Sequence, residues 1–175
     1  MRISALALMA GLVLASHAAP SVAMRADSAI DPLSMHLVAS AAEAQARGDL
    51  DTATGYFESA LAVHPRNRNA FLGLAQIARV QGLPGKAIGF YREALLIEPR
   101  DVAALAGQGE AMVEKGAIEL ARQKLADARK YCRDKCPQLA GLEAAIAKGE
   151  ARRTMSAEAV MPRPVATGGN DGSRN

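Results

Sequence analysis

The sequence repeats itself every 34 residues, and this repetition limits the possible folds more than any other feature. The chain reads GYFESALAVHPRN from Gly55 and GFYREALLIEPRD from Gly89, 34 residues later. Extending this register gives three copies without insertions, at 34–67, 68–101 and 102–135. A unit of this length cannot bury its own apolar face, so neighbouring copies must stack to form one continuous core.

The apolar residues predict that each copy is made of helices. Half of the 175 residues are apolar, chiefly Ala and Leu, and the sequence has no Trp, three Phe and three Tyr. Such residues form helices readily, whereas strands favour β-branched and aromatic side chains. Turn glycines, prolines and capping residues place the expected helices at about 32–47, 50–64, 68–81, 84–97, 102–115, 117–132 and, as a capping helix, 137–149.

Small and large residues recur at fixed offsets in each copy. The recurring positions are Leu37, Phe71 and Leu105; Ala41, Ala75 and Gly109; Gly48, Gly82 and Gly116; Ala53, Ala87 and Ala121; Phe57, Tyr91 and Leu125; Ala60, Ala94 and Ala128; and Pro65 and Pro99. This pattern resembles the tetratricopeptide repeat family from Ser34 to about Lys135. The resemblance implies an all-α fold, a right-handed α-α superhelix of three 34-residue helix-turn-helix repeats plus a C-terminal capping helix.

The first 23 residues are predicted to be a secretory signal peptide. Arg2 provides a basic start, an apolar run follows, and small residues precede cleavage after Ala23 or, as a second choice, Ala18. An uncleaved membrane anchor is disfavoured because the apolar run is shorter than the about 20 residues that cross a bilayer. The Ala- and Arg-rich composition indicates a bacterial source. We therefore expect a periplasmic or secreted protein with no stable membrane insertion after cleavage.

The rest of the chain divides into three segments by composition. We expect a linker at 24–31, the repeat domain at 32–150 and a tail at 151–175. The tail has no apolar periodicity and is rich in Gly, Pro and Ser, which predicts disorder.

The residue pattern contains no catalytic arrangement. His36 and His64 lack Ser–His–Asp or metal-ligand spacing, and Gly107 and Gly109 have no phosphate-binding motif around them. The net charge of +3 comes from closely mixed acids and bases, unlike a nucleic-acid-binding surface. We expect no enzymatic activity, no cofactor, no metal and no nucleic-acid partner.

Cys132 and Cys136 are the one chemically distinctive pair. In an oxidising compartment their closeness predicts a disulfide between the end of the sixth helix and the capping helix. Such a small loop would contribute about 2 kcal/mol of stability in the chain-entropy treatment. Free thiols and a two-thiolate redox or copper site are the alternatives, and the latter lacks further ligands in the sequence.

The family resemblance also implies where a partner binds. In this family the first helix of each repeat lines a concave groove that receives a peptide or a helix of another protein. The implied groove residues are Val38, Ala42, Asn69, Leu72, Gln76, Arg79, Ala106, Glu110 and Val113. The family's best-known subgroup grips a peptide carboxylate with Lys and Asn, but the corresponding positions here are Val38, Ala42, Gly73, Ala103 and Gly107. That clamp is therefore absent.

Two functions fit these expectations. The first is a non-enzymatic protein–protein interaction scaffold or adaptor of the bacterial envelope, which binds a peptide or helix of a partner in the groove. The alternative is a structural assembly module, or a subunit of an envelope complex, that self-associates. The expected oligomeric state is a monomer or a weak dimer.

Overall fold

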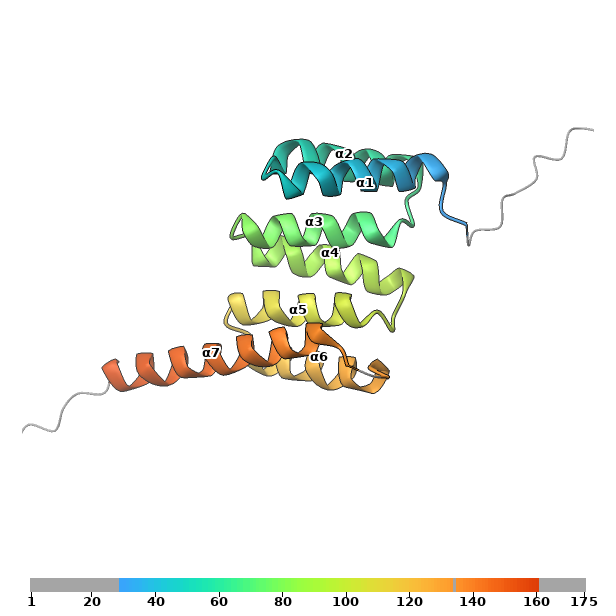
Figure 1. Cartoon of the computed structure of the whole chain (residues 1–175). Coiled ribbons are helices and arrows are strands. Elements are labelled where there is room, and N and C mark those ends of the chain that lie inside the picture. The colour runs from blue at the N-terminus through green and yellow to red at the C-terminus, as the bar shows by residue number, and fades with distance from the viewer. Residues whose placement is uncertain (1–28, 134, 161–175) are drawn as a thin grey trace, which may run out of the picture.

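The computed structural model describes residues 29–133 and 135–160, and every regular element within these ranges is an α-helix. The helices form antiparallel pairs stacked one on the next, as in a superhelix, and a last helix packs against the third pair (Figure 1). In chain order they are α1 (Pro32–Ala46), α2 (Leu50–Val63), α3 (Arg68–Val80), α4 (Pro84–Ile97), α5 (Val102–Glu114), α6 (Ile118–Tyr131) and α7 (Pro137–Val160).

Parts of three predicted segments lie outside the described residues. These parts are the signal peptide at 1–23, positions 24–28 of the linker and positions 161–175 of the tail.

Capping residues set the start of the first helix in each pair. The six repeat helices begin and end within one residue of their predicted bounds. Asp31, Asn67 and Asp101 precede α1, α3 and α5, and each side chain accepts hydrogen bonds from backbone N–H groups of the first turn. These groups have no partner within the helix, so the caps fix where the helices begin.

The turn inside each pair requires a left-handed backbone conformation. Gly48, Gly82 and Gly116 provide it, with φ of 79°, 69° and 85°. A side chain would be strained at these angles, and glycine is not. The three glycines therefore end the first helices and let the chain reverse direction.

The capping helix α7 is longer than predicted. The sequence led us to expect a helix end near 149 and disorder from 151, but α7 continues to Val160. The repeat register explains the difference, because the position 34 residues after Gly116 is Glu150. Without a turn glycine, the chain stays helical through a run of good helix formers. We had treated the lack of apolar periodicity as a lack of helix, and that inference was wrong.

The core consists of alanines that allow close helix contact and larger residues that fill the remaining gaps. The fully buried alanines at the predicted small positions are Ala41, Ala53, Ala60, Ala75, Ala87, Ala94, Ala121 and Ala128. Phe57 and Tyr91 each reach from one repeat to a glycine of the next. A Cβ added to Gly73 would lie under 3.0 Å from the Phe57 ring, and one added to Gly107 equally close to Tyr91. Glycine at these positions therefore serves packing between repeats.

The first repeat presents polar residues on its outer face. In α3, Ala70, Leu74 and Ile77 are buried against the preceding repeat. The residues 34 positions earlier in α1 are His36, Ser40 and Glu43, which are exposed or half-buried. Terminal repeats with a polar outer face need no further neighbour to cover them.

The other end of the stack is covered by α7. Leu139, Leu142 and Ile146 of α7 are buried in one cluster with residues of α5 and α6. The sulfur atoms of Cys132 and Cys136 lie at disulfide distance, between the end of α6 and the start of α7. This placement agrees with the expected disulfide, which would hold α7 close to the helix that it covers.

Candidate functional site

The helices α1, α3 and α5 form one side of the stack (Figure 1). Cα atoms of α1 approach α3 within 8 Å, and those of α3 approach α5 equally closely. No such approach occurs between α2, α4 and α6 within the described part of the chain. The first helices are therefore crowded together and the second helices are spread apart, which makes the side of α1, α3 and α5 the concave one. We call it the concave face.

Seven of the nine predicted groove residues are accessible on the concave face. Ala42, Asn69 and Gln76 are exposed, and Val38, Leu72, Arg79 and Glu110 are half-buried. Within this set, Gln76 and Arg79, together with Val80, line an open depression.

The structure corrects the other two groove positions. Ala106 is only 2% exposed and Val113 only 4%, because α7 packs against α5 and covers both. In the repeats without such a cover, the equivalents of Ala106 are Val38 and Leu72 and those of Val113 are Gln45 and Arg79, and all four stay half-buried. The accessible surface therefore lies mainly on α1 and α3, and on α5 only at positions that α7 leaves open.

The concave face presents both apolar and polar groups. Met35, 58% exposed, and the half-buried Val38 and Leu72 lie toward the N-terminal ends of α1 and α3. Toward the C-terminal ends, Gln45 donates a hydrogen bond from Nε2 to Oε1 of Gln76 at 3.3 Å. Exposed Asn69 also lies at the N-terminal end of α3, and Val80, 71% exposed, lies at its C-terminal end, so both ends of the face combine apolar and hydrogen-bonding groups.

Arg79 joins α3 to α5 at the polar side of the concave face. Its Nη1 donates to Glu110 Oε2 at 2.5 Å, and its Nη2 and Nε donate to Glu114 Oε1 at 2.6 and 3.0 Å. Burial by itself would lower the pKa of Arg79, but the hydrogen bond to Glu114 and the two carboxylate charges outweigh it and raise that pKa. The guanidinium therefore stays charged and holds both carboxylates in place.

Tyr91 lies beneath this ion-pair network. Burial raises the pKa of the Tyr91 phenol, and a hydrogen bond with Arg79 offsets part of that rise. The phenol is therefore neutral at physiological pH. It adds a hydrogen-bonding group to the network without adding charge.

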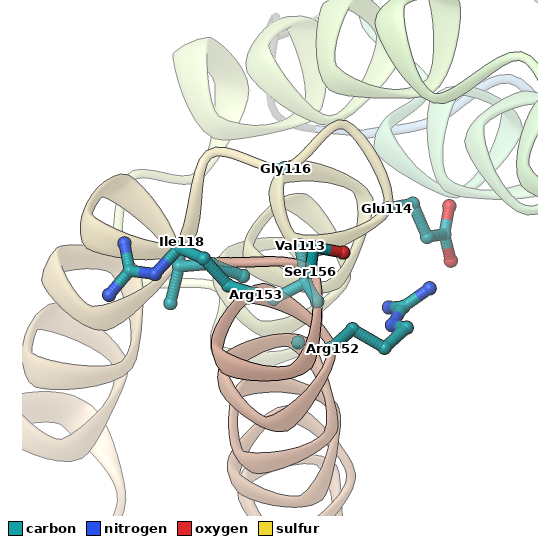
Figure 2. Close-up of a pocket in the computed structure, with 8 residues that line it drawn as sticks. Val113, Glu114, Gly116, Ile118, Arg152, Arg153 and Ser156 are labelled. Carbon is teal, nitrogen blue, oxygen red and sulfur yellow. The ribbon is translucent and has the colours of Figure 1, made fainter. Parts of the chain in front are cut away.

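A pocket opens at the edge of the concave face, between the α5–α6 turn and α7 (Figure 2). Its volume is about 350 Å³, and it is lined by Val113, Glu114, Gly116, Ile118, Gly149, Arg152, Arg153 and Ser156. Figure 2 shows Arg152 and Glu114 on the same side of the pocket and Arg153 beside Ile118 on the other. We call this space the α7 pocket.

Sequence reasoning missed the residues that α7 adds to this site. Arg152, Arg153 and Ser156 fall in the stretch that we expected to be a disordered tail. The absence of a turn glycine at Glu150 was the feature that could have revealed the longer helix. A longer helix next to the α5–α6 turn would then have predicted a pocket between that turn and α7.

The described residues contain neither a group of potential metal ligands nor a helix suited to cross a membrane. Within 29–133 and 135–160, no three His, Cys, Asp or Glu side chains are grouped closely enough to hold a metal ion. Across the same part of the chain, no helix is both long enough and apolar enough to cross a bilayer.

Comparisons with known proteins identify the repeat. Residues 38–104 match the sequence model of a family described as Tetratricopeptide repeat. The crystal structure of the Sgt2 TPR domain from Aspergillus fumigatus is similar, with a TM-score of 0.69, 16% identity, and coverage of 83% of this chain and 95% of that one. No curated protein is similar enough in sequence to count as a match.

A mutant O-GlcNAc transferase from Thermobaculum terrenum is also similar, with a TM-score of 0.60 and 24% identity. The match covers 65% of this chain but only 22% of the transferase chain. At these identities, the likeness to both structures concerns the fold alone.

Proposed function

Because the chain is a tetratricopeptide repeat protein, we propose that it is a non-enzymatic scaffold that binds a peptide or helix of a partner protein on its concave face. The observation that carries this proposal is the composition of that face. Exposed Met35 and half-buried Val38 and Leu72 share the concave face with the polar Gln76 and Arg79. Specific protein interfaces combine apolar anchors with a smaller number of orienting polar groups in this way.

The polar outer face of the first repeat argues against end-to-end self-association as the main function. His36, Ser40 and Glu43 would be desolvated without partners if a second copy stacked on this face. At the other end, α7 already covers the apolar surface of the third repeat. The assembly module therefore remains the second candidate, and the concave face is the better docking surface.

We place this scaffold in the bacterial envelope, as a periplasmic or secreted protein. Support comes from the basic start at Arg2, the apolar run after it and the small residues before Ala23. A Cys132–Cys136 disulfide also suits an oxidising compartment. Mass spectrometry of the exported protein should find a start at Met24 or Ala19, and retention of Met1 in a membrane fraction would contradict this location.

A matched pair of variants tests the concave face. Ala42 on α1 and Ala62 on α2 are both exposed helical alanines, but only Ala42 belongs to the concave face. Replacing either by Arg should leave the fold unchanged, because neither packs in the core. A photo-crosslinker at Gln76 would identify the partner, whose purified form is then titrated against each variant.

We expect Ala42→Arg to weaken binding of the purified partner at least about tenfold, since a charge would enter a desolvated contact. Ala62→Arg should bind like the wild type. Equal affinity of both variants would exclude the concave face as the binding site. A concentration-dependent dimer together with equal affinities would favour the assembly module.

A further inference from the structure

The α7 pocket exists because α7 runs past the α5–α6 turn. A Cβ added to Gly149 would lie 2.5 Å from Cδ1 of Ile118 and 3.0 Å from Cγ1 of Val113, so only glycine permits this close approach. Beyond the contact, α7 continues to Val160 and supplies the second wall of the pocket. Val113 and Ile118 are both buried and give that pocket an apolar floor.

Arg152 differs from the other guanidinium groups near this pocket. Arg79 is held by two carboxylates, Arg122 pairs with Glu119 and Glu150, and Arg153 lies 3.6 Å from Glu119. Arg152 makes no such pair with another residue in the described ranges. Arg152 is exposed, so its guanidinium is free to make charge-assisted, bidentate hydrogen bonds to an incoming carboxylate.

Glu114 does not cancel the preference for an anion. It lies on the same side of the pocket as Arg152 (Figure 2), but its carboxylate is already engaged by Arg79 at 2.6 and 3.0 Å. Arg153 lies on the opposite wall, where its charge is shared with Glu119 at 3.6 Å. A carboxylate brought into the pocket would therefore meet Arg152, which has no paired carboxylate in the described ranges, while Glu114 shares the Arg79 guanidinium with Glu110.

The α7 pocket and the concave face share one residue, Glu114. Glu114 takes part in the Arg79 network on the concave face and also lines the pocket. A partner segment lying across α3 and α5 would thus reach the pocket at the C-terminal edge of the face. Because the pocket is open to solvent, such a segment could pass through without ending there.

We propose that the α7 pocket binds an Asp or Glu side chain of the partner segment, with Arg152 pairing the carboxylate and the apolar floor contacting a neighbouring aliphatic residue. That a partner segment lies on the concave face is part of the proposed function, and this inference rests on it. The pocket's preference for an acidic side chain beside an aliphatic one can be tested without knowing the partner.

The test uses the exported full-length protein labelled with ¹⁵N and three small probes. Acetyl-Leu-Asp-amide presents an acidic side chain, acetyl-Leu-Asn-amide is its uncharged match, and acetyl-leucine presents a terminal carboxylate. The backbone amide signals of Gly116, Gly149 and Ser156 report on the pocket walls. We expect acetyl-Leu-Asp-amide to shift these signals with at least about tenfold higher affinity than either other probe.

Variants assign the preference to Arg152. Arg152→Gln should reduce the affinity for acetyl-Leu-Asp-amide by about tenfold. Arg92→Gln, a change at a guanidinium exposed on α4, should leave it unchanged. The circular dichroism spectrum of each variant checks that the helices remain intact.

Three results would overturn the inference. They are equal binding of the Asp and Asn probes, stronger binding of acetyl-leucine, and wild-type affinity in Arg152→Gln. The experiments also distinguish a wrong pocket proposal from a wrong proposed function. If Ala42→Arg abolishes partner binding while Arg152→Gln does not affect it, the concave face is the docking site and the pocket plays no part.

Discussion

The first repeat and α7 occupy opposite ends of the same stack, and they end it by different means. In α1, His36, Ser40 and Glu43 stand where α3 has Ala70, Leu74 and Ile77, which are buried against the preceding repeat. At the other end, the apolar surface of α5 and α6 is retained and α7 is added to cover it. One end is completed by changing residues, and the other by adding a helix.

This difference has a consequence for function. Changing residues leaves the first repeat with the same shape as the second, so its concave residues Val38 and Ala42 stay accessible. Adding a helix buries Ala106 and Val113 and also creates the α7 pocket beside them. The two ends of the concave face should therefore make different contacts with one bound partner.

The largest expected effect concerns the core of the α7 end. Leu142 is fully buried, so Leu142→Ala should lower the free energy of unfolding by about 2–5 kcal/mol through lost burial and a cavity. Ser40→Ala, at the polar end, should change it by less than about 0.5 kcal/mol. Urea unfolding followed by circular dichroism measures both values. Similar losses in the two variants would mean that the two ends do not differ as described.

An intermediate effect is expected from giving the first repeat the outer face of the second. The triple variant His36→Ala, Ser40→Leu, Glu43→Ile gives α1 the same residue types that α3 has at 70, 74 and 77, but on a surface that no neighbouring repeat covers. Exposed apolar patches of this kind drive association. Sedimentation should show concentration-dependent dimers for the variant, beyond any self-association of the wild type. Unchanged sedimentation would show that these three residues do not control stacking.

The smallest expected effect comes from restoring a glycine to α7. Glu150→Gly should cost about 1 kcal/mol of helix stability and allow the helix to end as α1, α3 and α5 do. Amide hydrogen exchange at 151–156 should then become faster. Ala147→Gly, an exposed position of the same helix outside the turn register, is the control and should speed exchange less at these residues. Equal exchange in the two variants would remove Glu150 from the explanation of the long helix.

Most of the fold could be predicted because local features encode it. The caps Asp31, Asn67 and Asp101 and the glycines at the turns act on their own neighbours in the chain, so they fix helix ends wherever the helices pack. The one large error in helix length arose at α7, where the register position of Glu150 was not considered.

The candidate site was predicted less completely than the fold. Positions on α1 and α3 lie where the repeat register puts them, because each copy folds in the same way. Ala106 and Val113 occupy equivalent register positions but are buried, since a segment from outside the repeats packs on them. Arg152 enters the site only because α7 continues past its predicted end.

By itself, the sequence determined the 34-residue period, the ends of the six repeat helices and the buried alanines, because these follow from interactions between residues close in the chain or related by the repeat. The tertiary structure alone decided how α7 lies against α5. That arrangement depends on how Leu139, Leu142 and Ile146 fit a surface assembled from two other helices, and shape complementarity between distant segments is not encoded in any local pattern. The packing of α7 against α5 both buries Ala106 and Val113 and forms the α7 pocket.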